Sequence, residues 1–259
     1  MNIIDLQNIT VFQGRNKILD NFSLTIDESQ STVILGPNGS GKTTILKLLN
    51  RELYIVEDKK SSLKIFEKDR WNVDDLRSNL GVVSQNLQYG YSKSALGLYV
   101  VLSGFYSSDG IWQHQKFDEN QLNRAKEVME LLSISGLQDR EFSTMSSGEQ
   151  RKFLLARSLV NDPAVLVFDE PTSGLDMSTC FQYLEIIREL IGMGKKVILV
   201  THHIHEIPPE VTRVILLKEG KVVEDGDKDK VLNDASLTNL FDWPIKVIKE
   251  NGYYQVIPG

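Results

Sequence analysis

The sequence is poor in cysteine and in long apolar runs. Cys180 is the single cysteine, so no internal disulfide can form, as is typical of proteins in a reducing cytosol. The longest uninterrupted apolar runs, at 98–102 and 164–168, are five residues long, whereas a helix that crosses a bilayer needs roughly 20. We therefore expect a chain that does not cross a membrane by itself.

Positive charge is scarce as well. The chain has 29 Lys and Arg against 35 Asp and Glu, a net charge of −6. This charge argues against non-specific electrostatic binding of nucleic acid by the whole chain. Residues 1–10 contain no Lys or Arg and no apolar core, so we expect no signal peptide. A hydrophobic content of 41% and a charged content of 25% are those of an ordinary folded protein.

Short apolar runs alternate with longer helical patterns along the chain. This alternation predicts an α/β fold with a mostly parallel sheet. The expected strands cover 32–35, 81–83, 164–168, 196–200 and 214–217, and the expected helices follow Gly41 and cover 118–134, 148–160 and 176–190.

Three regions depart from that alternation. Between about 84 and 161 the strand signal gives way to helical periodicity, which predicts a helical subdomain at 85–161 inserted into a core of 1–84 and 162–259. The first 30 residues alternate apolar and polar positions, which favours an antiparallel sheet. Asn251-Gly252 between two alternating runs predicts a C-terminal hairpin.

Residues 36–43 match the phosphate-loop pattern G-x-x-x-x-G-K-[ST], placed between an apolar strand and a helix. Glycines in such a loop let backbone N–H groups converge on phosphate oxygens, and the helix N-terminus adds its positive dipole end. Lys42 is expected to reach the β and γ phosphates, and Thr43 to coordinate Mg²⁺.

A second phosphate-site element is the apolar strand that ends in Asp169 and Glu170. The Asp is placed to hold Mg²⁺ through water, and the Glu to orient and polarise an attacking water. A phosphate loop followed by strand-end acids still leaves GTPases, small-molecule kinases, helicases and transport ATPases open.

The segment Met145-Ser-Ser-Gly-Glu-Gln150 decides among these classes. It resembles the signature L-S-G-G-Q of the ATP-binding subunits of ABC (ATP-binding cassette) transporters, and the likeness covers essentially the whole chain. Met145, Ser147 and Glu149 depart from that pattern, whereas Ser146 and Gly148, which contact γ-phosphate in the family, are retained. Taken alone, Ser-Ser-Gly at a helix start is also a plain N-cap.

Other family elements follow in order. Gln85 matches the Q-loop glutamine that senses metal and water, residues 173–176 match the D-loop, and His202 matches the switch histidine that contacts γ-phosphate. Three nearby histidines, His202, His203 and His205, also suggest a metal cluster, an alternative that requires further ligands.

Adenine recognition departs from the family pattern. Relatives stack the base on an aromatic residue at the position of Gln13, and Phe12 is its neighbour. Either Phe12 stacks on adenine or it is a core residue of the edge sheet. Trp71 and Trp112 are interpreted as packing residues.

The resemblance implies a cytoplasmic ATPase that forms a head-to-tail dimer and powers membrane permease subunits, to which it binds on the cytoplasmic face. The strings at 102–105 and 240–247 resemble importers of metal chelates, siderophores and molybdate. A soluble ABC ATPase of the iron–sulfur assembly type is the alternative, and a GTPase is disfavoured because a guanine-reading N-K-x-D is missing. The implied catalytic residues are Lys42, Gln85, Glu170 and His202, the metal ligands are Thr43, Gln85 and Asp169, and the nucleotide ligands are Gly36, Pro37, Asn38, Gly39, Ser40, Gly41, Lys42, Thr43, Thr44, Phe12, Ser146 and Gly148.

Overall fold

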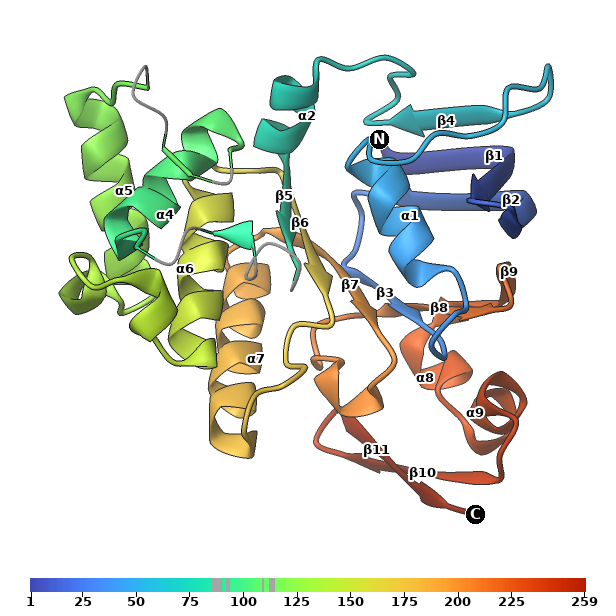
Figure 1. The fold of residues 1–259 in the computed structure, drawn as a ribbon. Helices are drawn as coiled ribbons and strands as arrows, with labels where there is room; N and C mark the ends of the chain where they lie inside the picture. Colours follow the sequence, from blue (N-terminus) through green and yellow to red (C-terminus); the bar gives the residue numbers. More distant parts are fainter. Residues whose placement is uncertain (85–89, 92–93, 109, 112–114) are drawn as a thin grey trace. The chain divides into compact units, whose positions relative to one another are not determined.

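The computed structural model describes residues 1–84, 90–91, 94–108, 110–111 and 115–259 (Figure 1). The described chain divides into two units, one made of 1–73 with 196–259 and the other of 74–195. None of the helices in these described ranges combines the length and the apolar character that a membrane span requires.

The first unit is built around β3 (Thr32–Leu35), a fully buried strand. It pairs in parallel with β7 (Lys196–Thr201) and with β8 (Arg213–Lys218), and Val, Ile and Leu fill these strands as expected for a sheet covered on both faces. β9 (Lys221–Asp227) adds an antiparallel edge to β8. The carboxyl ends of β3 and β7 lie at the same edge of the sheet, where two segments of the candidate site begin.

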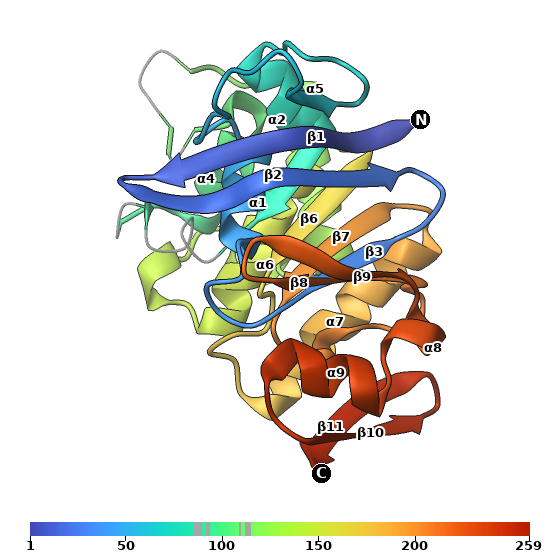
Figure 2. The same ribbon diagram turned by 90° about the vertical axis from the view of Figure 1, so that its right-hand side faces the viewer.

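A second sheet in this unit is antiparallel. β1 (Asn2–Gln13) lies between β2 (Asn16–Asp27) and β4 (Ser62–Ile65), and Figure 2 shows β1 and β2 as two long neighbouring strands. Their alternating sequences bury one face, which includes Ile4, Leu6 and Ile26.

The C-terminal part of the first unit consists of two short helices and a hairpin. The helices are α8 (Lys228–Val231) and α9 (Asp234–Phe241). The hairpin pairs β10 (Ile245–Glu250) with β11 (Tyr253–Pro258) around Asn251-Gly252, as the two-residue turn predicts. It packs against the turn η4 (Ile204–Glu206).

The second unit combines two strands with helices. β5 (Leu80–Val83) pairs in parallel with β6 (Val165–Asp169). The helices are α2 (Val73–Asn79), which starts at the unit boundary, α4 (Gly97–Leu102), α5 (Glu119–Leu131), α6 (Ser147–Leu159) and α7 (Met177–Gly192). α4, α5 and α7 all pack on α6, which therefore occupies the centre of this unit.

The predicted α/β class is confirmed, with its mostly parallel pairing and its N-terminal antiparallel sheet. Strand β9 was not predicted, because its sequence Lys-Val-Val-Glu-Asp-Gly-Asp is mostly charged and alternately exposed, as suits an edge strand. The division into a core of 1–84 and 162–259 and a helical insertion at 85–161 stays a prediction.

Candidate functional site

A strand, a glycine-rich turn and a helix follow one another at the phosphate-loop motif. The chain leaves β3 at Leu35, turns through 36–41 and enters α1 (Lys42–Leu49). A Cβ on Gly36 would collide with the carbonyl oxygen of Leu217, and Gly41 has a φ of +107°, which residues with a side chain rarely adopt. The two glycines therefore permit a path that ends at the first N–H groups of α1.

The polar side chains of this loop suit a phosphate group. Lys42 is 5% exposed, and its Nζ donates to the carbonyl oxygens of Gly36 at 2.7 Å and Pro37 at 3.0 Å. The buried Oγ of Ser40 has no hydrogen-bond partner among the described residues. An ammonium, a hydroxyl and a helix N-terminus together match the acceptor oxygens of a phosphate chain, and the exposed Thr43 occupies the first turn of α1, where the motif places a Mg²⁺ ligand.

His202 comes directly after β7 and is joined to the phosphate loop through the backbone. The N–H of Gly36 donates to the carbonyl oxygen of Thr201 at 3.3 Å, so the residue before His202 contacts the first residue of the loop. The rings of His202 and His203 lie 3.8 Å apart, and those of His203 and His205 5.1 Å apart.

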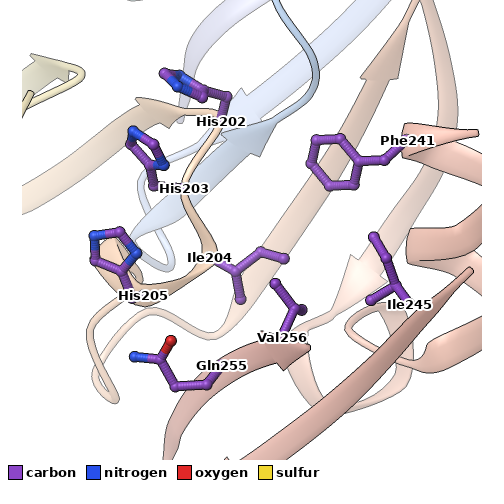
Figure 3. A pocket seen from close by; sticks show the side chains of 8 residues that line it. All are labelled: His202, His203, Ile204, His205, Phe241, Ile245, Gln255 and Val256. Atoms are coloured by element: carbon purple, nitrogen blue, oxygen red, sulfur yellow. The ribbon is translucent and has the colours of Figure 1, made fainter. Parts of the chain in front are cut away.

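These three histidines form one wall of a pocket of about 240 Å³. Figure 3 shows them on one side, with Phe241 and Ile245 on the other. The pocket is smaller than the roughly 300–1,000 Å³ of typical ligand sites, and its lining includes His202 but no residue of the phosphate loop. Within the described ranges, no group of three or more His, Cys, Asp or Glu side chains is arranged to hold a metal ion.

In the second unit, β6 ends in the two predicted acids. Four buried apolar residues precede the partly exposed Asp169. Glu170 has a φ of +46°, a left-handed conformation that is rare for a residue with a side chain and is found at functional sites. The backbone at Glu170 is therefore held by its surroundings.

Arg151 of α6 supplies part of that hold. Its side chain is buried, with 4% of its surface exposed, and its guanidinium donates to three carbonyl oxygens, those of Glu170 at 3.1 Å, Pro171 at 2.7 Å and Ser173 at 2.6 Å. Sequence reasoning missed this residue. The sequence pattern that could have identified Arg151 is its helical spacing from the buried positions Leu154, Leu155 and Ser158.

The signature segment forms the start of α6. Ser146 is the N-cap: its hydroxyl accepts the N–H of Glu149 at 3.3 Å, and the Glu149 carboxylate accepts the N–H of Ser146 at 2.7 Å, a capping box. The bond from the Ser146 N–H is the main cause that lowers the pKa of Glu149, and Arg140 at 3.7 Å acts in the same direction. Glu149 is therefore an anion at neutral pH.

Gly148 has a packing role in the same segment. A Cβ on it would collide with Cγ2 of Thr179 on α7, so the absent side chain lets α6 and α7 approach each other. Asp176 of the predicted D-loop caps α7, accepting from the N–H of Thr179 at 3.1 Å and from its hydroxyl at 2.6 Å. These two bonds lower the pKa of Asp176. The γ-phosphate contacts of Ser146 and Gly148 stay predictions.

Three further sequence predictions concern single residues. Gln85 and Trp112 lie outside the described residues. Phe12 is 43% exposed, so the alternative that made it a core residue of the edge sheet is wrong, and stacking on adenine stays a prediction. Trp71 packs on Phe66 and donates its indole N–H to the Ile65 carbonyl oxygen at 2.8 Å, as expected of a packing residue.

Known proteins resemble this chain over most of its length. The family model for ABC transporters matches residues 19–173. The ABC transporter ATP-binding protein YlmA of Bacillus subtilis (strain 168) is 30% identical over 95% of this chain and 93% of its own. The hemin import ATP-binding protein HmuV of Photobacterium damsela subsp. piscicida is 32% identical over 95% of this chain and 92% of its own.

Solved structures show the same fold. The ADP conformation of MJ1267, an ATP-binding cassette of an ABC transporter, has a TM-score of 0.78 at 21% identity and covers 93% of this chain and 98% of its own. The dimeric post-hydrolysis structure of the cassette MJ0796, bound to ADP and Pi, has a TM-score of 0.70 at 26% identity, with 86% and 98% covered.

The chain therefore belongs to the ABC transporter family and is an ATP-hydrolysing, ATP-binding subunit. The class of P-loop ATPase that the motifs indicated is confirmed, and so is the resemblance on which it was based.

Proposed function

We propose that this subunit powers the import of a metal-containing chelate through separate permease subunits, which it binds on the cytoplasmic face of the membrane. Support for import comes from the 32% identity to a hemin import ATP-binding protein over 95% of this chain. The resemblance of residues 102–105 and 240–247 to importer ATPases adds weaker support, because such short sequences also occur in unrelated proteins.

The residues that fit the phosphate chain of ATP carry the proposed chemistry. Lys42 neutralises charge on the β and γ phosphates, Glu170 orients and accepts a proton from the attacking water, and His202 contacts the γ-phosphate. Thr43, Asp169 and Gln85 would hold Mg²⁺, which would supply further charge neutralisation at the phosphates. Positioning and electrostatics account for most of such a reaction, because phosphoryl transfer needs little covalent help from the protein.

The active unit is proposed to be a head-to-tail dimer, in which each ATP lies between the phosphate loop of one copy and Ser146 and Gly148 of the other. The observation that carries this arrangement is the exposed Ser146 at the start of α6, because an exposed side chain is accessible to a second copy. The solved MJ0796 cassette, 26% identical, is a dimer bound to ADP and Pi, which supports a dimer here.

Purification from detergent-solubilised membranes tests the transport proposal. An affinity-tagged chain is expected to retain a polytopic membrane protein, and the reconstituted complex is expected to take up hemin into vesicles when ATP is present on the side of this subunit. Lys42→Ala is the matched control, which should bind the same partner and transport nothing. Retention of soluble partners alone would instead favour an ABC ATPase without a permease.

A further inference from the structure

Thr201 occupies a junction between the phosphate loop and the histidine segment. It is the last residue of β7, is fully buried, and lies opposite Leu35 of the parallel strand β3. Its carbonyl oxygen accepts the N–H of Gly36 at 3.3 Å. The backbone on the N-terminal side of His202 is therefore tied to the first glycine of the phosphate loop.

The side chain of Thr201 ties the backbone on the other side of His202. Its Oγ1 accepts the N–H of His203 at 2.9 Å and donates its own hydrogen to the Glu206 carboxylate. The turn η4 closes the same segment, because the N–H of Glu206 donates to the His203 carbonyl oxygen at 3.3 Å. His202 thus lies between Thr201 and His203, and the Thr201 side chain bonds to the backbone N–H of His203.

Glu206 determines which way the hydrogen bonds of the Thr201 hydroxyl run. Its side chain is 0% exposed, and a buried carboxylate is costly unless hydrogen bonds compensate for the lost water. The Thr201 hydroxyl donates its hydrogen to a carboxyl oxygen of Glu206, and a hydroxyl has only one hydrogen to donate. The lone pairs of the hydroxyl are then left to accept the N–H of His203, which fixes the order of the chain of bonds.

We infer that Thr201 and Glu206 are positioning residues for ATP hydrolysis: they hold His202 in register with the phosphate loop. The inference rests on the proposed contact of His202 with the γ-phosphate. A misplacement of about 1 Å at a reacting group can cost on the order of 100-fold in rate, so a threonine that fixes both sides of His202 affects turnover without touching ATP.

Steady-state ATP hydrolysis, ATP binding and thermal unfolding test the inference in Thr201→Val, Thr201→Ser, His202→Ala and the Thr201→Val/His202→Ala double variant. Valine keeps the shape and loses the hydroxyl, so we expect kcat to fall roughly 10- to 100-fold. ATP affinity should stay close to that of the wild type, because the bond to Gly36 uses the backbone. Serine keeps the hydroxyl and should restore most of kcat.

The double variant separates positioning from a merely structural role. Because Thr201 acts through His202, the double variant should hydrolyse ATP no more slowly than His202→Ala alone. Losses that multiply, or a wild-type kcat in Thr201→Val beside an impaired His202→Ala, would overturn the inference. A wild-type kcat in His202→Ala itself would instead reject the proposed function of that histidine.

Glu206→Gln provides a second measurement if Thr201→Val does not fold. Glutamine has the same size, but its amide can present a donor as well as an acceptor to Thr201, so the direction of the bonds is no longer imposed. An intermediate loss of kcat at unchanged ATP affinity is expected. A wild-type kcat in this variant would remove Glu206 from the positioning pair.

Discussion

The helix after the phosphate loop and the helix of the signature segment begin in opposite ways. No side chain in the described part of the chain caps α1, which follows Gly41. Helix α6 is closed by the Ser146–Glu149 capping box. The first four N–H groups of a helix lack partners within it. At α6 the Ser146 side chain accepts one of these N–H groups, whereas no described side chain does so at the Gly41 cap of α1. This difference is the one that the proposed roles require, in which α1 binds phosphate and α6 presents a rigid start to a second copy.

Loss of the ammonium in the phosphate loop should have the largest effect. In Lys42→Ala the fixed positive charge disappears, and we expect ATP hydrolysis to fall by on the order of 100-fold or more, with weaker nucleotide binding. Circular dichroism should show an intact fold, because the Lys42 ammonium donates to the carbonyl oxygens of Gly36 and Pro37, which belong to the phosphate loop itself. Turnover near the wild-type rate would remove the phosphate loop from the account.

Arg151→Met tests the rigidity of α6. The substitution removes the guanidinium donors to the carbonyl oxygens of Glu170, Pro171 and Ser173. The bond to Pro171 is buried, and a buried acceptor that loses its partner costs about 1–3 kcal/mol. We expect a lower free energy of unfolding in urea and a reduced kcat, because the backbone of Glu170 loses its tether. Lys is the matched control, since it keeps the charge with fewer donors. A loss of stability at constant kcat would show that Arg151 stabilises the fold but does not position Glu170 for catalysis.

Gly148→Ala tests the close approach of α6 and α7. The new methyl group meets Cγ2 of Thr179, and overpacking of this kind typically costs about 1–3 kcal/mol. Thr179→Ser removes that methyl and keeps the hydroxyl that bonds to Asp176, so the double variant should regain stability in the same urea titration. Equal stabilities of the single and double variants would contradict the contact.

Glu149→Gln should give the smallest effect. Glutamine also forms a capping box, so stability at pH 7 should change little. The pKa of Glu149 is below its ordinary value of 4.5. Its contribution to stability is therefore fully present above the unfolded pKa and is lost as the pH falls through the lower folded pKa. Urea titrations from pH 7 to pH 3 should show that the free energy of unfolding of the wild type loses the contribution of the Glu149 carboxylate. The difference in the free energy of unfolding between the wild type and the variant should therefore shift in favour of the variant as the pH falls.

Local patterns predicted one class of feature well and another poorly. The phosphate loop and the hairpin at Asn251-Gly252 depend on glycine conformation, and the buried strands depend on runs of Val, Ile and Leu, all of which can be read within a few residues. The partners of Arg151 lie 19 to 22 residues away, and the neighbour of Gly148 lies on another helix. Such contacts are tertiary, so no local pattern contains them. Phe12 was left between two environments because periodicity does not say which positions near a strand end are covered.

The central claim is that one site is shared by two copies through the phosphate loop of one and the signature helix of the other. Light scattering coupled to size-exclusion chromatography of Glu170→Gln tests it most directly, since this variant binds ATP but should cleave it very slowly. We predict the mass of one chain without nucleotide or with ADP, the mass of two chains with ATP, and no dimer when Ser146→Arg is added. A Glu170→Gln chain that stays monomeric in saturating ATP, or that dimerises equally well with Ser146→Arg, would contradict the shared site.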